Sequence, residues 1–149
     1  MYIYESPIGP LCLTAKNGLI TGLYFEDNGI VPNANEETVL RAASLELDAY
    51  FAGKLKVFTV PFRPAGTPFR MKVWEALCTI PYGETITYKQ LAERIGLPSA
   101  YRAVGGANHN NPISIIIPCH RVIGTGGNLV GYGGGLNAKE WLLKHEGII

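Results

Sequence analysis

The residues that could do chemistry in this sequence lie near its C-terminus, where Cys119 is followed directly by His120. A cysteine reacts as its thiolate, and because the pKa of a free thiol is about 8.5, a base must accept the proton at neutral pH. His120 could be that base, and Glu146 could orient the imidazole and stabilise its charged form. Adjacent side chains on a regular element point apart, so this pair requires a water bridge or an irregular turn after Pro118.

The spacing alone does not show that Cys119 is reactive, because a cysteine at the end of an apolar run is more often an inert, buried small hydrophobe. We expect Cys12, in a strand-like run, and Cys78, at the end of a helix, to be structural. Three cysteines with irregular spacing argue against a disulfide framework and a zinc ribbon. They favour a reducing, cytoplasmic environment.

The elements around Cys119 can be predicted from the sequence. The β-branched run Ile113–Ile117 predicts a buried extended segment that leads into the cysteine. The last helix, over about Ala138–His145 with Asn137 as its cap, places Glu146 at the negative helix end, where a carboxylate is unfavourable. Such a local violation often marks a functional site. The Gly-rich segment 124–135 has no lysine after its glycines and does not read as a phosphate loop.

A helix-turn-helix is predicted upstream of the cysteine. Thr67 and Pro68 begin a helix over Phe69–Cys78, and the Thr87–Gln90 capping box begins another that ends near Gly96. Ser99 is expected to cap a further helix through about Asn108. Two short helices joined by a tight turn are typical of DNA-binding units, in which the second helix enters a groove.

Two glycines in that second helix, Gly105 and Gly106, each cost about 1 kcal/mol relative to alanine. They indicate either close packing against another helix or close approach of the backbone to DNA, and both can hold.

The N-terminal part reads as a small sheet and one helix. Asn17-Gly18 predicts a hairpin between Leu11–Lys16 and Leu19–Phe25. A loop over Asp27–Asn35 then precedes a helix over Glu36–Ala52, and residues 54–66 make a connector. No catalytic cluster is found here.

The chain has 149 residues with 47% hydrophobic and 17% charged residues, which predicts one or two folded domains and excludes a disordered chain. No apolar run is long enough to span a membrane, and the N-terminus lacks signal-peptide character. Residues 1–53 hold two bases and seven acids, whereas residues 54–149 hold eleven bases and five acids. A basic C-terminal part favours an anionic partner, with nucleic acid first.

The stretch Asn111–Val122, NPISIIIPCHRV, resembles the active-site stretch of the O6-alkylguanine-DNA alkyltransferases, also called methylated-DNA–protein-cysteine methyltransferases. The resemblance extends from about Thr67 to Gly147. It includes Tyr82-Gly83, TYKQLA at 87–92, RAVGGA at 102–107, Gly131-Tyr132 and WLLKHE at 141–146. The N-terminal third matches in general plan.

The resemblance implies a small ribonuclease-H-like α/β domain, residues 1–60, and a mostly helical, winged-helix-like domain with the helix-turn-helix, residues 67–149. It implies transfer of an alkyl group from O6 of guanine in double-stranded DNA to the protein's own cysteine, once per molecule. We expect a cytoplasmic monomer that needs no cofactor and no metal.

Site residues follow from the same resemblance. Cys119 would be the acceptor, His120 the water-mediated base and Glu146 its partner, while Asn111 braces the turn. Tyr88 would help to rotate the lesion out of the duplex and donate toward the leaving base.

The remaining positions belong to the DNA face and the pocket. Arg102 would fill the gap in the duplex, beside further second-helix contacts at Ala103, Gly105, Gly106 and Asn108. The pocket would consist of Tyr132, Gly133, Ser114 and Val122, with the Gly133 amide near O6 and the carbonyls of Cys119 and Val122 accepting from the guanine amine. Asn108 and His109 stand where relatives often carry an apolar or basic wedge.

Two other functions remain possible from the residues. A lesion-binding module would bind alkylated DNA without transfer, although such proteins replace the reactive cysteine that is present here. A cysteine hydrolase using Cys119, His120 and Glu146 would turn over many times without DNA.

Overall fold

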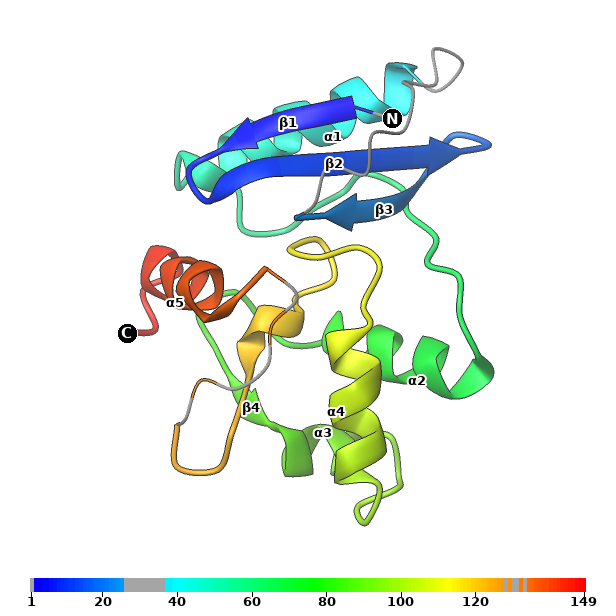
Figure 1. The fold of residues 1–149 in the computed structure, drawn as a ribbon, viewed down its shortest axis with the longest axis vertical. Coiled ribbons are helices and arrows are strands. Elements are labelled where there is room, and N and C mark those ends of the chain that lie inside the picture. The colour runs from blue at the N-terminus through cyan, green and yellow to red at the C-terminus, as the bar shows by residue number, and fades with distance from the viewer. Residues whose placement is uncertain (1, 26–36, 128, 130–131, 133) are drawn as a thin grey trace.

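The computed structural model describes residues 2–25, 37–127, 129, 132 and 134–149. Figure 1 shows a sheet with one helix along its outer face, and a group of helices on the other side of the sheet. The elements are β1 Tyr2–Ser6, β2 Gly9–Lys16, β3 Leu19–Tyr24, α1 Glu37–Phe51, α2 Pro68–Leu77, β4 Ile86–Thr87, α3 Tyr88–Arg94, α4 Tyr101–His109, the 3-10 helix η2 Cys119–Arg121, β5 Val122–Ile123 and α5 Leu136–His145.

The N-terminal sheet is antiparallel in the order β1-β2-β3. Asn17 and Gly18 join β2 to β3 with φ angles of 54° and 76°, as the predicted hairpin requires. Helix α1 is confirmed close to its predicted bounds, and Gly53 follows it with φ 76°. The predicted loop over 27–35 lies outside the described residues.

Local capping signals place two helices of the C-terminal part correctly. The Thr67 hydroxyl accepts from the Arg70 amide at 3.2 Å at the start of α2. At α3, Thr87 accepts from the Gln90 amide at 3.1 Å, and the Gln90 side chain accepts from the Thr87 amide at 2.8 Å. Both halves of the predicted capping box are therefore present.

Two other predicted caps are wrong. Helix α4 begins after Ala100, without a side-chain cap, because the Ala100 amide donates to the Leu97 carbonyl and closes the preceding turn. Helix α5 begins after Gly135 rather than at Asn137. Gly135 has φ 91°, a conformation that glycine adopts without strain, and the chain enters the helix earlier than the side-chain signal indicates.

The run Ile113–Ile117 is buried as predicted, but it is not extended. Ile115 has φ 71°, and the Ile117 amide donates to the Ile113 carbonyl at 3.0 Å, so the segment folds into a compact turn. β3 pairs with its start, since the Ser114 amide donates to the Leu23 carbonyl at 3.1 Å. This tertiary pairing overrides the strand propensity of the isoleucines.

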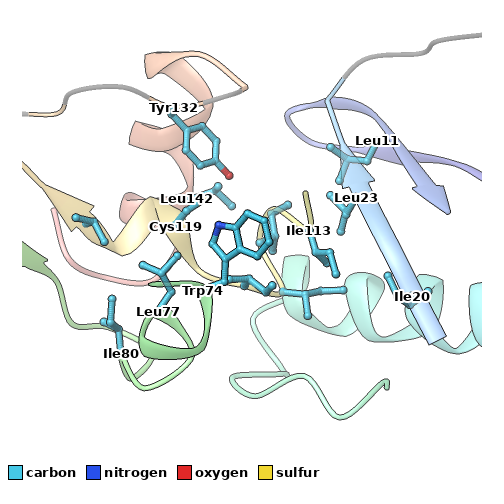
Figure 2. Close-up of a cluster of buried hydrophobic side chains, with 14 of the residues drawn as sticks. Leu11, Ile20, Leu23, Trp74, Leu77, Ile80, Ile113, Cys119, Tyr132 and Leu142 are labelled. Atoms are coloured by element: carbon cyan, nitrogen blue, oxygen red, sulfur yellow. The ribbon is translucent and has the colours of Figure 1, made fainter. Parts of the chain in front are cut away.

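One hydrophobic cluster joins the sheet to the helices. Figure 2 shows Leu11, Ile20 and Leu23 of the sheet on one side of Trp74 and Ile113, with Cys119 on the other side. Cys119 thus belongs to this core, on the side away from the sheet. Cys12 is buried, as expected, whereas Cys78 after α2 is exposed. In the described part of the chain, no helix combines the length and apolar character needed to cross a membrane.

Candidate active site

An irregular turn positions Cys119, as its adjacency to His120 requires. After Pro118 the chain forms the 3-10 helix η2, with the Arg121 amide donating to the Pro118 carbonyl at 3.1 Å. Asn111 lies beneath this turn. Its Nδ2 donates to the Ile117 carbonyl at 2.8 Å, and its Oδ1 accepts from the Ile113 amide at 3.0 Å.

Glu146, at the C-terminus of α5, binds the imidazole of His120. His120 Nε2 lies 2.6 Å from Glu146 Oε2, and both side chains are fully buried. Arg121 binds the same carboxylate from the turn, with Nε 2.8 Å from Oε1 and Nη2 3.2 Å from Oε2. The helix dipole disfavours a carboxylate at this position, and the Arg121 cation and hydrogen bonds from elsewhere in the fold stabilise it.

The carboxylate fixes the tautomer of His120. Burial by itself would raise the pKa of Glu146, but hydrogen bonds from His120, Arg121 and Tyr50 hold it well below its ordinary value. An ionised carboxylate only accepts, so Nε2 carries the proton and Nδ1 presents a lone pair. Nδ1 is buried and has no hydrogen-bond partner among the described residues. Burial lowers the pKa of His120, which keeps the ring neutral and able to accept a proton.

The thiol of Cys119 is 4% exposed and protonated in this state. Burial raises its pKa to about 11, while the side chains of Asn111 and Ser114 and the charge of Lys139 lower it. The proton must therefore leave as the sulfur reacts, which requires a base within the same buried site.

Lys139 is a functional candidate that the sequence analysis missed. Its side chain is fully buried, Nζ donates to the Val122 carbonyl at 2.6 Å, and Nζ lies 6.0 Å from the centre of the Tyr88 ring. Burial lowers the pKa of Lys139 to about 8, and the nearby Cys119 opposes this shift. A signal was available, because Lys139 shares the apolar stripe of α5 with Leu142 and Leu143.

Three of the four residues expected to line a substrate pocket, Tyr132, Ser114 and Val122, are among the described residues. Tyr132 is 7% exposed and points inward above Cys119 (Figure 2), and its hydroxyl has no hydrogen-bond partner within the described ranges. Its ring packs edge-on against Phe25 at 5.4 Å. Ser114 and Val122 are buried nearby. Gly133 lies outside the described residues.

The expected DNA face divides into exposed and buried positions. Arg102, Ala103 and Gly106 are exposed on α4. Gly105 faces α3, where a Cβ would lie 3.7 Å from the Tyr88 ring, whereas a Cβ on Gly106 would have no neighbour within 4 Å. Gly105 is therefore packed against a neighbouring side chain, whereas Gly106 faces open space.

Asn108 does not fit the expected surface contact with DNA. It is 2% exposed, and its Nδ2 lies 3.4 Å from the Cys119 carbonyl, because its position on α4 turns it toward the core. His109 beside it is exposed.

Comparison with known proteins covers nearly the whole chain. Residues 68–148 match the family model for the 6-O-methylguanine DNA methyltransferase DNA-binding domain, and residues 2–64 match that for its ribonuclease-like domain. The methylated-DNA–protein-cysteine methyltransferase of Mycobacterium leprae is 50% identical over 95% of this chain and 88% of its own length. That of Methanosarcina barkeri is 51% identical over 97% and 94%.

A solved structure has the same fold. Mycobacterium tuberculosis OGT in complex with DNA is 47% identical and superposes with a TM-score of 0.87, over 97% of this chain and 90% of that one. Together with the buried Cys119 and the His120–Glu146 pair, these matches place the chain in the 6-O-methylguanine DNA methyltransferase family.

Proposed function

We propose that this protein repairs DNA by transferring the alkyl group of O6-alkylguanine to Cys119, and that each molecule acts once. The family and the methylated-DNA–protein-cysteine methyltransferases of M. leprae and M. barkeri support the reaction. The DNA complex of the M. tuberculosis relative supports duplex DNA as the partner.

One observation carries the assignment of the base. His120 donates Nε2–H to Glu146 and keeps a buried Nδ1 lone pair that no described residue occupies. That atom is suited to accept the Cys119 proton, through one water molecule, as the sulfur attacks. The carboxylate of Glu146 then stabilises the imidazolium.

The transfer step balances without a cofactor. The sulfur of Cys119 forms a bond to the alkyl carbon, the bond between that carbon and O6 breaks, and its electron pair stays on the guanine. The thiol proton passes to His120, and the Tyr88 hydroxyl donates toward the leaving base. The product is a thioether, which has no carbonyl for water to attack, so the cysteine is not regenerated.

The reacting carbon is out of reach inside a duplex, so the nucleotide must be extruded at a cost of a few kcal/mol. Arg102, exposed on α4, is proposed to occupy the vacated stack, because a planar guanidinium can stack and bond the orphaned base. The α4 backbone at Ala103, Gly105 and Gly106 is proposed to approach the duplex. Tyr132, Gly133, Ser114 and Val122 are proposed to enclose the base.

We also propose that residues 1–60 and 67–149 form two domains. We propose a cytoplasmic location as well, which the three free cysteines support because disulfides are rare in reducing compartments.

The deciding experiment mixes the protein with duplex DNA that contains one O6-methylguanine and measures intact and peptide masses. We expect a gain of one methylene equivalent on the Cys119 peptide, at one per protein. Cys119→Ala should bind the duplex without gaining mass. Tight binding by the native protein without a mass gain would instead identify a lesion-binding module.

A further inference from the structure

Tyr50 connects the N-terminal part of the molecule to the carboxylate of the active site. Its hydroxyl donates to Glu146 Oε2 at 2.6 Å, and its own carbonyl accepts from the His145 ring at 2.6 Å. Tyr50 is fully buried. The end of α5 is therefore held at two adjacent residues by one residue of α1.

The oxygen that Tyr50 binds is the same one that binds His120. Oε2 of Glu146 accepts hydrogen bonds from His120 Nε2 at 2.6 Å and from Arg121 Nη2 at 3.2 Å, in addition to the one from the Tyr50 phenol. Burial and the Glu146 charge raise the pKa of Tyr50, so the phenol stays protonated and remains a donor. A neutral donor on this oxygen orients the carboxylate and disperses its charge without adding a cation.

We propose that Tyr50 is a positioning residue for alkyl transfer: its phenol fixes the orientation of Glu146 toward His120 and limits the basicity of that pair. The inference rests on the proposed function and adds a residue to the same site. No catalytic cluster can be recognised from the sequence of residues 1–53, because Tyr50 there forms part of the apolar stripe of α1.

The charged groups around the His120–Glu146 pair come from several elements. Arg121 in η2 and Lys139 in α5 both disfavour protonation of His120, and Glu146 favours it. Tyr82 lies beside Arg121, 5.7 Å from ring centre to guanidinium carbon, and the His145 ring packs on Tyr50 at 5.1 Å. Replacing the Tyr50 phenol leaves all of these groups in place.

A matched control exists in the same part of the fold. The Tyr4 hydroxyl donates to the Asp48 carboxylate at 2.6 Å, and Tyr4 is 7% exposed, but this pair involves β1 and α1 and does not reach Glu146. Tyr4→Phe and Tyr50→Phe therefore each remove one phenol–carboxylate hydrogen bond from the N-terminal part. Only Tyr50→Phe removes a hydrogen bond from Glu146.

The experiment measures single-turnover alkyl transfer from an O6-methylguanine duplex against pH, at a temperature where both variants stay folded. We expect Tyr50→Phe to be about three- to tenfold slower at neutral pH. Loss of the donor leaves more charge on Oε2 and raises the pKa of His120, so the acidic limb should move up by about 0.5 to 1 pH unit. Tyr4→Phe should match the native protein. A Tyr50→Phe profile that coincides with that of Tyr4→Phe overturns the inference.

A double-mutant cycle supplies the second test. In a Glu146→Gln background the carboxylate is already absent, and Tyr50→Phe should change the transfer rate by less than about twofold. An undiminished effect in that background would show that Tyr50 acts only through folding, and would overturn the positioning role. Failure of the native protein to gain mass would refute the proposed function itself, whereas native transfer with unaltered Tyr50→Phe kinetics refutes only this inference.

Discussion

The ammonium nitrogen of Lys139 donates to the carbonyl oxygen of Val122 across 2.6 Å, inside the buried site. The resemblance to known alkyltransferases assigns that same carbonyl to the guanine amino group. A carbonyl oxygen has two lone pairs, so it can accept from both donors at once. Binding of the base as proposed therefore does not require Lys139 to leave this carbonyl, and the Lys139 charge continues to lower the pKa of Cys119.

Lys139→Met should slow alkyl transfer by roughly tenfold or more, because it removes the cation that favours the Cys119 thiolate. The native pKa of Lys139 is lowered to about 8, so the ratio of native to variant rates should shrink above that pH as the native side chain loses its proton. Thermal stability should be kept or raised, since a buried charge is replaced by an apolar group of similar volume. Lys144 is an exposed lysine on the same helix, so Lys144→Met is the control. Equal single-turnover rates would contradict a role for the charge.

Glu146→Gln should cost stability as well as rate, because it leaves Arg121 without its buried counter-charge and His120 without its carboxylate acceptor. Breaking such a buried ion pair costs about 3–5 kcal/mol. The folded pKa of Glu146 lies below its ordinary value of 4.5, so its contribution is complete above that value and is lost as the pH falls through the folded pKa. Urea unfolding at several pH values should show the largest difference from the native protein near neutrality. A difference in unfolding free energy that grows toward acid pH would contradict a lowered pKa of Glu146 in the folded protein.

Arg102→Ala should weaken action on duplex DNA without harming the chemistry. Arg102 is exposed, so stability should change by no more than about 0.5 kcal/mol. Binding of duplex should weaken, because the variant has no guanidinium to occupy the vacated stack. Transfer from a free O6-alkylguanine base needs no extrusion and should keep its native rate. Equal losses with duplex and free base would place Arg102 in the chemical step instead.

Gly106→Ala should stabilise the free protein by up to about 1 kcal/mol, because the helix gains propensity and a Cβ meets no neighbour. If α4 approaches DNA as proposed, the same methyl group should weaken duplex binding. Gly105→Ala differs, since its Cβ would contact the Tyr88 ring at 3.7 Å. Thermal melts and binding titrations of both variants separate the two effects. Unchanged binding by Gly106→Ala would remove that glycine from the DNA face.

The sequence predicts those features that depend on a few neighbouring residues. The Asn17-Gly18 hairpin and the caps at Thr67 and Thr87 are local, because each donor and acceptor lie within three residues of each other. The Cys119-His120 motif identifies the site because both its chemistry and its family resemblance are contained in one short stretch.

Features that depend on tertiary contacts were missed. The positive φ of Ile115 follows from pairing with β3, and no propensity of isoleucine predicts it. The Tyr50–Glu146 hydrogen bond joins residues that lie 96 positions apart in the chain. Asn108 was expected at the surface because its helix faces DNA on one side, but a short helix also has an inner face, and this residue lies on it.

Phe25 and Gly134 limit the side chains that fit at each other's positions. A Cβ at Gly134 would lie 2.7 Å from the Phe25 ring, which in turn packs on Tyr132. A smaller side chain at position 25 would make room for alanine at 134, whereas alanine at 134 beside Phe25 produces a steric clash next to Tyr132. The order in which the two substitutions are introduced therefore decides whether the intermediate protein is strained, although one position follows β3 and the other precedes α5.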